Sequence, residues 1–415
     1  MTHPCPCENP STDLPTSPDD FRTGRVITIS AAHGVHDIYT AFLPSLMPIF
    51  ISTLMLSKTE AGLLNVFLQV PSLLQPVIGH LADRVSLRYL VILAPAVSAA
   101  FMSLLPVAPG YGALTLFLLL AGLSSASIHS VGPVMAGRLS GPHLGRGMGF
   151  WMVGGELGRT LGPIVIVGAI QLLTVPSTPL VMVAGLLTSV VLFLLLRDVA
   201  GRPVVSADSL PWREALHSLG PLLVPLTGVI IVRSFVVSAL TTYLPTFLSE
   251  GGSGLVAAGA SLSLLQAAGV GGALLGGSVS DRVGRRTILF LSFLVTPLLM
   301  GAFLLVDGWM RIPLLLLLGV GSLSVGPVIM ALVQESLPGN RALANGLYMA
   351  LSFVLRSGVI VVIGLIGDAL SLRWAFAVSA AMGVVGLPFV SRLPGASVGS
   401  KERVSDVRRD NPGGG

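Results

Sequence analysis

Long apolar stretches alternate with short polar segments along almost the whole chain. A helix that spans a bilayer needs about 20 mainly apolar residues, and twelve stretches approach or exceed that length. They cover residues 26–50, 60–79, 89–107, 111–137, 147–173, 179–196, 220–247, 255–277, 287–305, 312–336, 342–365 and 374–391. Because hydrocarbon offers no water to backbone groups, such spans must be helical. The pattern predicts an all-α membrane protein with twelve transmembrane helices.

Composition agrees with this prediction and removes other classes. Hydrophobic residues make up 53% of the 415 residues and charged residues only 10%, whereas a soluble domain carries about 25% charged residues. This balance excludes a disordered chain, a secreted disulfide protein and almost any cytosolic enzyme. The sequence contains neither a GxxxxGK[ST] phosphate loop nor a GxSxG turn. We therefore expect no enzyme, no ATP-driven pump and no cofactor.

The distribution of basic residues predicts the orientation. Of the 24 Lys and Arg residues, 18 fall on the side of both tails, three on the opposite side and three within helices. Cytoplasmic loops carry the excess of Lys and Arg, so both termini are expected in the cytoplasm of a plasma-membrane protein. The basic balance thus reflects topology and not nucleic-acid binding. The predicted organisation is a tail (1–24), a six-helix half (25–196), a linker (197–219), a second half (220–392) and a tail (393–415).

The two halves are related by an internal repeat. Asp83 and Asp281 occupy similar loops 198 residues apart, and an S-V-G-P segment begins at Ser130 and again at Ser324. Near the ends of the first and seventh spans, Leu-Pro-Ser from residue 43 recurs as Leu-Pro-Thr from residue 244. Two pseudo-symmetric six-helix halves of parallel orientation are typical of a rocking transporter with its site between them.

The loop after the second helix of each half resembles the G-x-x-x-D-R-x-G-R-R signature of the major facilitator superfamily. The second half matches in full, at Gly277, Asp281, Arg282, Gly284, Arg285 and Arg286. The first half matches at Gly79, Asp83, Arg84 and Arg88, while Ser86 and Leu87 depart from it. The resemblance covers residues 25–392 and implies alternating access, with these loops latching the cytoplasmic gate. Charges that only set the topology are the alternative.

A narrower resemblance is to the fosmidomycin-resistance type of exporter. It rests on His33 and Asp37 in the first span, Leu-Gln-Pro at 74–76, a Ser- and Ala-rich run at 122–129 that ends in His129, and a Gly-rich run at 153–163. Ser130, Glu156 and Arg159 depart from the expected pattern. The resemblance implies export of a phosphonate-like anion, and the departures bear on the substrate and not on the architecture.

The fifth span also resembles the antiporter motif of drug–proton exporters. Gly149, Gly158, Gly162 and Pro163 have its spacing, whereas Ile166 and Val167 stand where two glycines are expected. This favours export over import. Plain helix packing is the alternative, because glycines on one helix face also permit close approach.

Three arginines lie near mid-membrane, where a charge is costly and therefore indicates function. They are Arg159, Arg233 and Arg356, and the first and third are 197 residues apart, at matching places in the two halves. A guanidinium group suits carboxylate, phosphate or phosphonate, so we expect the three to bind an anionic substrate, with Gln75 and Gln266 also lining the path. For Arg159 an ion pair with Glu156, three residues earlier, is the alternative.

A titratable cluster is predicted between the first and fourth spans. His33, His36 and Asp37 are spaced to share one helix face, and His129 lies at a similar depth. An aspartate among imidazoles can change charge during a transport cycle, so we expect these residues, with Glu156, to carry the proton. A divalent-metal site and simple hydrogen bonding between helices are the alternatives.

Together these patterns predict a secondary transporter, most simply a monomer in the bilayer, that exports a small organic or phosphonate-like anion in a proton-coupled cycle. Proton-coupled uptake of an anion, divalent metal transport and a sensor built on a transporter fold remain as alternatives.

Overall fold

The computed structural model describes residues 21–75, 77–78, 81, 86–141, 144–199, 212–336 and 341–393. These residues form helices joined by short loops, and none of them lies in a strand. Ten helices in this part of the chain are long and apolar enough to cross a membrane. The other two predicted spans are the first and second, and each is broken into shorter helical pieces.

The helices follow the predicted order. In the N-terminal half they are α1 (Thr23–Thr40) with α2 (Leu43–Thr53), α3 (Lys58–Gln69) with η1 (Val70–Leu74), α5 (Arg88–Leu104) with η2 (Leu105–Val107), α6 (Tyr111–Leu139), α7 (Leu144–Leu173), and η3 (Val175–Val181) with α8 (Met182–Leu196). In the C-terminal half they are α9 (Trp212–Ser238) with η4 (Ala239–Tyr243) and α10 (Leu244–Glu250), α11 (Leu255–Val283), α12 (Arg285–Leu305), η5 (Gly308–Met310) with α13 (Arg311–Leu323) and α14 (Val325–Ser336), α15 (Arg341–Ala369), and α16 (Leu372–Val385) with α17 (Leu387–Ser391).

The repeated Leu-Pro dipeptide interrupts a span in each half. Pro44 stands in the first turn of α2 and Pro245 in the first turn of α10, where a missing N–H is tolerated. The α-helix is interrupted just before each proline, at Ala41 in the first half and by the π-helical turn η4 in the second. Each span continues past the dipeptide, and α2 ends at Thr53 and α10 at Glu250, three residues beyond the predicted ends at residues 50 and 247.

A row of glycines brings α7 against α1. A Cβ atom added at Gly154, Gly158 or Gly162 would lie 2.1–2.5 Å from a backbone oxygen of α1, so only glycine fits. By contrast, a Cβ atom at Gly149 would meet nothing within 4 Å. Gly149 of the predicted motif is thus not part of this contact, and Gly154, which the motif lacks, is. The four-residue spacing of glycines is the signal that identifies the contact.

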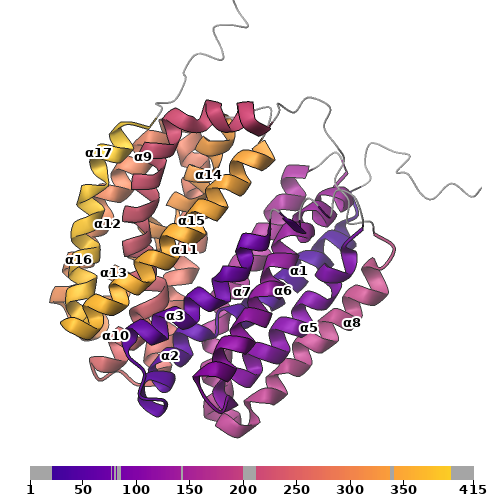
Figure 1. Ribbon diagram of the computed structural model, residues 1–415, viewed down its shortest axis with the longest axis horizontal. Coiled ribbons are helices and arrows are strands. Elements are labelled where there is room, and N and C mark those ends of the chain that lie inside the picture. Colours follow the sequence, from indigo (N-terminus) through magenta and orange to yellow (C-terminus); the bar gives the residue numbers. More distant parts are fainter. Residues whose placement is uncertain are drawn as a thin grey trace, which may run out of the picture.

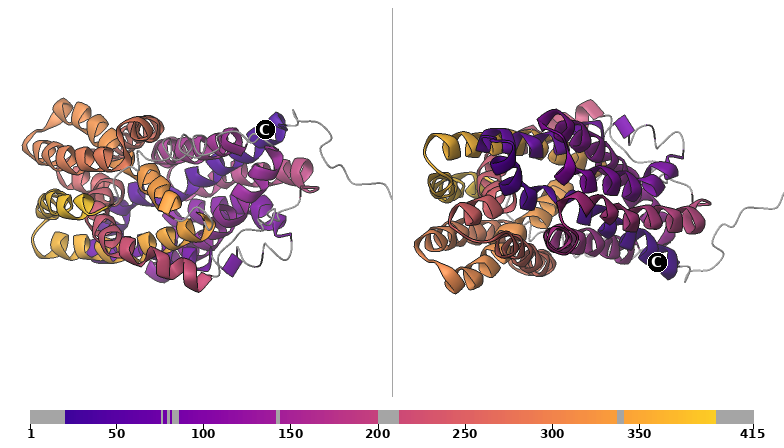
Figure 2. Two further views of the ribbon diagram at one scale, coloured as in Figure 1. Left: turned by 90° about the horizontal axis from the view of Figure 1, so that it is seen from above. Right: turned by 90° about the horizontal axis from the view of Figure 1, so that it is seen from below.

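The two halves lie side by side (Figures 1 and 2). Helices α2, α3 and α7 of the first half pack against α10, α15 and α11 of the second. The halves diverge toward the side where α7 begins and α14 ends (Figure 1). One apolar core joins them at the other end, where Phe42 and Leu46 share a cluster with Leu240 and Ile363.

Polar contacts close the same end, which is the predicted outer end. The Asp368 carboxylate at the end of α15 accepts hydrogen bonds from the backbone N–H groups of Lys58 (2.6 Å) and Thr59 (2.9 Å) at the start of α3. A carboxylate at a helix N-terminus also complements the helix dipole. The Lys58 ammonium pairs with Glu250 of α10 at 3.1 Å, and the buried Tyr243 hydroxyl donates to backbone carbonyls of both halves.

Candidate functional site

A cavity of about 1380 Å³, part of it open to solvent, lies between the halves. Both halves contribute to its wall, and the polar members of the wall are His33, Asp37, Thr40, Asn65, Gln69, Ser72, Gln75, Ser125, His129, Arg159, Thr241, Gln266 and Arg356. Met330, Met349 and Phe353 supply apolar surface on the C-terminal side. A cavity that combines apolar surface with convergent polar groups is the usual form of a small-molecule site.

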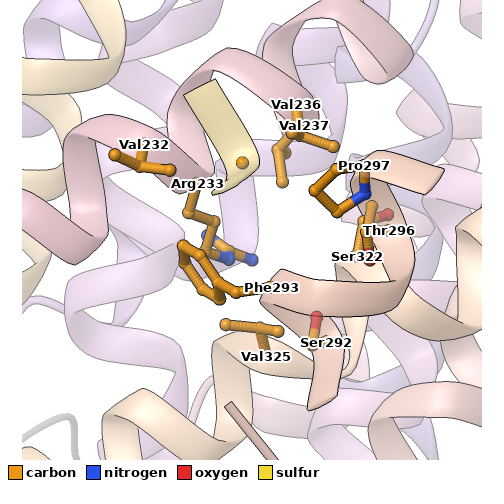
Figure 3. A pocket seen from close by; sticks show the side chains of 11 residues that line it. Val232, Arg233, Val236, Val237, Ser292, Phe293, Thr296, Pro297, Ser322 and Val325 are labelled. Carbon is orange, nitrogen blue, oxygen red and sulfur yellow. The ribbon is translucent and has the colours of Figure 1, made fainter. Parts of the chain in front are cut away.

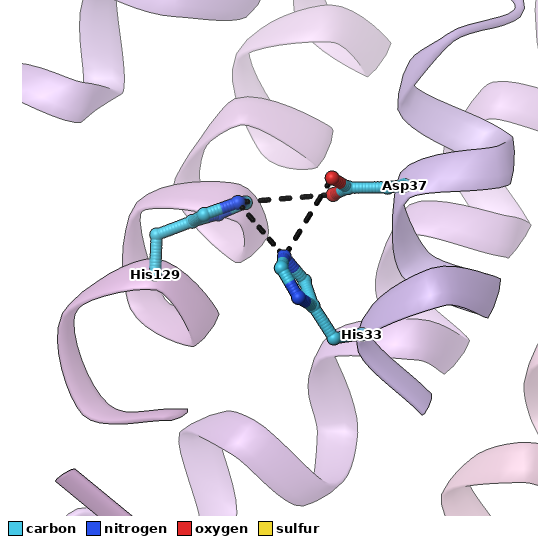
Figure 4. Close-up of side chains that lie close together, drawn as sticks. All are labelled: His33, Asp37 and His129. Atoms are coloured by element: carbon cyan, nitrogen blue, oxygen red, sulfur yellow. Dashed lines mark hydrogen bonds and ion pairs between the residues drawn. The ribbon is translucent and has the colours of Figure 1, made fainter. Parts of the chain in front are cut away.

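One wall of the cavity carries a cluster of three titratable groups (Figure 4). The Nε2 atoms of His33 in α1 and His129 in α6 are 3.2 Å apart. The Asp37 carboxylate lies 3.6 Å from Nε2 of His33 and 3.8 Å from Nε2 of His129. His33 and Asp37 are buried, whereas the His129 side chain is 31% exposed. All three residues line the cavity, and His129 is the most exposed of them.

Hydrogen-bond partners assign the tautomers of both imidazoles. Nδ1 of His33 lies 2.9 Å from the backbone oxygen of Trp151, and Nδ1 of His129 lies 2.8 Å from that of Ser125. A carbonyl oxygen only accepts, so both Nδ1 atoms carry hydrogen. In the neutral rings both Nε2 atoms then present lone pairs, to each other and to the Asp37 carboxylate. A group of three acceptors at this spacing has room for one added proton.

Arg159 joins this cluster from α7. Its Nη1 donates to Oδ2 of Asp37 at 2.7 Å, and its Nη2 donates to the Glu156 carboxylate one helical turn earlier. The glycine contact between α1 and α7 makes the pair with Asp37 possible, because Gly158 leaves room for the Asp37 side chain beside the helix backbone. The ion pair with Glu156 that the sequence suggested is present, and Asp37 is a second partner that spacing along the chain could not reveal.

His36 lies apart from the cavity. It is fully buried, its Nδ1 lies 2.9 Å from the Ser98 hydroxyl of α5, and the Ser98 hydroxyl lies 3.1 Å from that of Ser124. His33 and Asp37 share the predicted face of α1, whereas His36 points toward α5. It approaches His129 only ring to ring, at 5.9 Å between centroids.

The opposite wall carries Arg356 of α15. Its Nη2 donates to the Thr241 hydroxyl at 3.1 Å, while its buried Nε has no hydrogen-bond partner in the described part of the chain. Gln75 and Gln266 line the same cavity, as predicted from their places in the halves. Asn65, Gln69 and Thr241 also line the cavity and were not predicted, because single uncharged polar residues within spans do not stand out from those that bond between helices.

Arg233 lies elsewhere. Its side chain enters a separate pocket of about 270 Å³ within the C-terminal half, between α9, α12, α13 and α16 (Figure 3). It is not among the residues that line the central cavity. The structure thus brings together Arg159 and Arg356 around one space, and places Arg233 in another.

The sequence profile of the Major Facilitator Superfamily matches residues 29–359. The chain belongs to this superfamily. It is a multi-pass membrane transporter and not an enzyme, with the fold of two six-helix halves predicted from its sequence.

Two relatives match this facilitator over most of their length. It is 25% identical over 371 residues to the fosmidomycin resistance protein of Escherichia coli (strain K12), covering 86% of this chain and 90% of that protein. It is 23% identical over 377 residues to the uncharacterized MFS-type transporter YfnC of Bacillus subtilis (strain 168), covering 87% and 91%.

Solved structures of other transporters share the fold. A bacterial homolog of the human lysosomal transporter Spinster, in an inward-facing and unoccupied conformation, has a TM-score of 0.76 at 14% identity, covering 90% of this facilitator and 97% of that chain. The nucleoside transporter NupG has a TM-score of 0.71 at 15% identity, covering 89% and 100%. At these identities the likeness concerns the fold alone.

The predicted gating residues of this facilitator are described only in part. Gly79, Asp83 and Arg84 lie outside the described residues, as do the surroundings of Gly277 and the side chain of Asp281. Arg88 begins α5, and Arg282 and Arg286 are exposed. Arg285 bonds the Ser280 hydroxyl and, at 2.9 Å, the Glu335 carboxylate of α14. Gly284 has a φ of 92°, in the left-handed region that favours glycine, where the chain turns from α11 into α12.

Proposed function

We propose that this transporter moves a small organic or phosphonate-like anion across the plasma membrane in a proton-coupled, alternating-access cycle, with both termini in the cytoplasm. The observation that carries the proposal is the pair of unlike walls around one cavity. A proton-accepting cluster of His33, Asp37 and His129 lines one wall, and Arg356, which has no carboxylate partner among the described residues, lines the other.

The assigned tautomers support the proton site. Because His33 and His129 each donate through Nδ1 to a carbonyl, an added proton resides on an Nε2 atom or on Asp37. A proton on Asp37 removes the negative charge that holds Arg159, while Glu156 still holds its other nitrogen. Protonation therefore alters the guanidinium that faces the substrate, which links the proton to the anion.

The charges of the cavity support an anionic substrate. Asp37 is the only carboxylate among the described lining residues, and Arg159 already neutralises it. Arg356 has a hydroxyl partner and an unpartnered Nε, so its charge is balanced by no carboxylate of the described wall. A buried unpaired charge is costly, and an anion in the cavity offsets that cost.

Export is the direction we propose, because the relative of Escherichia coli is named for resistance to a compound. A specific observation favours uptake as the second candidate. A proton on Asp37 frees one side of Arg159 for the substrate, so that proton and anion bind together, which is the requirement of a symporter. The sign of the proton movement that accompanies the anion distinguishes the two.

Metal transport is a weaker candidate at the same cluster. His33, Asp37 and His129 offer three ligand atoms within 4.8 Å of one another, and two imidazoles with a carboxylate suit a divalent cation. Against this, the Arg159 guanidinium lies 2.7 Å from Asp37 and would adjoin the metal.

The test uses purified protein in liposomes that enclose a pH dye. Phosphonates, monocarboxylates and dicarboxylates are added outside one at a time, with divalent cations as the rival set. We expect an anion to evoke proton movement that is lost in Arg356→Gln. For protein molecules of either orientation, internal alkalinisation indicates antiport and internal acidification indicates symport. A response to divalent cations alone, lost in His129→Ala and kept in Arg356→Gln, would overturn the proposal in favour of metal transport.

A further inference from the structure

An apolar strip follows the cavity face of α15 from Arg356 toward the open side. Phe353 and Met349 precede Arg356 by three and seven residues, a spacing that places all three on one helix face. All three line the central cavity, and each is half-buried. Because α15 begins on the side where the halves diverge (Figure 1), Phe353 and Met349 lie between the arginine and the opening. Met330 of the neighbouring α14 lines the cavity too, so Arg356 alone is polar among the described lining residues of α14 and α15.

The N-terminal half repeats this arrangement. Met152 of α7 precedes Arg159 by seven residues, as Met349 precedes Arg356, and the two methionines are 197 residues apart, like the two arginines. Met152 also lines the cavity and is 45% exposed. Since α7, like α15, begins on the open side, the cavity has two layers. The arginines lie deep in it, and the methionines lie about two helical turns nearer to the opening.

The length of the apolar strip indicates the size of a ligand that covers it. Seven residues of helix rise about 10 Å, the length of an extended chain of about eight carbons. A compact anion at Arg356 leaves Phe353 and Met349 in contact with water. An apolar chain attached to the anion covers both side chains, and burial of this surface is favourable. Methionine side chains are flexible and adapt to apolar ligands of different shape.

We propose that the substrate is an amphiphilic organic anion, with its acid group at Arg356 and an apolar chain that lies along Phe353 and Met349 toward the opening. This inference rests on the proposed function and adds an apolar body to the anion. It is independent of the direction of transport. The alternative use of the apolar layer is a gate, in which Met152 and Met349 approach each other when the halves close on the open side. The closing of such a gate does not depend on the length of the ligand.

The experiment measures the binding of a series of straight-chain phosphonates to purified protein in lipid nanodiscs by titration calorimetry. The series is ethyl-, butyl-, hexyl- and octylphosphonate, octanol serves as the chain without the acid, and the heat from empty nanodiscs is subtracted. We expect the dissociation constant to fall about threefold for each added methylene, because each one is buried against the strip. Octanol is expected to bind far more weakly than octylphosphonate, and Arg356→Gln is expected to lose the whole series.

Two variants alter the strip without changing the arginine. Met349→Gln keeps the length of the side chain and adds an amide, and Phe353→Ala removes the ring. We expect each to weaken the binding of octylphosphonate about tenfold, through lost apolar contact, and to leave that of ethylphosphonate unchanged. The matched control is Met310→Gln, at a methionine of η5 that is 48% exposed and does not line the cavity. It is expected to bind the whole series like the wild type.

The outcomes separate this inference from the proposed function. Dissociation constants that do not depend on chain length, with binding lost in Arg356→Gln, would overturn the amphiphilic substrate and leave the anion site in place. An equal weakening of every phosphonate in both Met349→Gln and Phe353→Ala would assign the strip to the gate and also overturn it. If no phosphonate binds, or if octanol binds as tightly as octylphosphonate, this inference and the proposed anion transport both fail.

Discussion

The two walls of the cavity differ in charge although the halves that form them share one ancestral pattern. In the N-terminal wall, Asp37 and Glu156 both pair with Arg159, so each of these three charges has a partner within 4 Å. In the C-terminal half, Arg356 and Arg233 have no carboxylate partner among the described residues. In the function that we propose, one wall gains and loses the proton, whereas the charge of the other wall is balanced by the transported anion.

Arg159 and Arg356 differ in their partners although their positions correspond. They occupy matching places, 197 residues apart, and both line the cavity. Their surroundings differ because α1 supplies Asp37 to Arg159, while the nearest polar partner of Arg356 is the neutral Thr241 hydroxyl. Matching arginines thus form an ion pair in one half and bond only a neutral hydroxyl among the described residues in the other.

Removal of the unpaired arginine should have the largest effect. We expect Arg356→Gln to lower anion transport at least about a hundredfold, because a charge-assisted and potentially bidentate contact is lost. Arg356→Lys keeps the charge without the planar fork, so it should recover part of the rate. Initial rates of uptake into liposomes measure both variants. Equal rates in Arg356→Gln and the wild type would remove the C-terminal half from anion recognition.

Neutralisation of Asp37 should affect coupling more than transport. We expect Asp37→Asn to lower the proton movement evoked by the anion about tenfold or more, while anion exchange across the membrane continues, because the amide does not titrate. The matched control is Asp198→Asn, which removes an exposed ion pair with Arg25 and should leave coupling unchanged. Unaltered proton movement in Asp37→Asn would contradict the role of the N-terminal cluster.

The glycine contact tests whether the fold positions that cluster. An added Cβ at Gly158 meets the backbone oxygen of Gly34 at 2.2 Å, so Gly158→Ala should cost about 1–3 kcal/mol of stability through overpacking. It should also disturb the pair of Arg159 with Asp37. Gly149→Ala lies on the same helix with nothing within 4 Å, and its thermal unfolding midpoint should equal that of the wild type or exceed it slightly.

Weakening the polar contacts between α15 and α3, which join the halves at the predicted outer end, should have the smallest effect. Asp368→Asn keeps an acceptor for the N-terminus of α3 but loses its charge, which should favour outward opening about threefold. A cysteine at Gln69, in a background without Cys5 and Cys7, reports this opening as faster labelling by an impermeant thiol reagent added outside. Asp307→Asn breaks an ion pair within the C-terminal half alone, with Arg311, and should leave the labelling rate unchanged.

The architecture could be predicted from the sequence, because lipid imposes helices of known length and a duplicated pattern imposes two halves. The interruptions within the first and seventh spans could not be predicted in this way. The interruptions at Ala41 and at the turn η4 depend on how backbone hydrogen bonds are made near Pro44 and Pro245. Hydropathy alone predicts the approximate length of each span and not these interruptions.

The site could be predicted in its members but not in its pairings. His33, Asp37 and Arg159 were identified because ionisable residues in a membrane are rare. That Asp37 bonds Arg159 depends on the close approach of α1 and α7, and that Arg233 leaves the cavity depends on the rotation of α9. Both are tertiary facts, set by packing between helices and not by spacing along one of them.

The most direct test of this division between the halves is the affinity for the transported anion, measured on purified protein from low to high pH. We predict that Arg356→Gln loses binding at every pH, whereas Asp37→Asn binds the anion but no longer responds to pH as the wild type does. Binding that survives in Arg356→Gln and disappears in Asp37→Asn would contradict it, because the anion would then be held by the half that we assign to the proton.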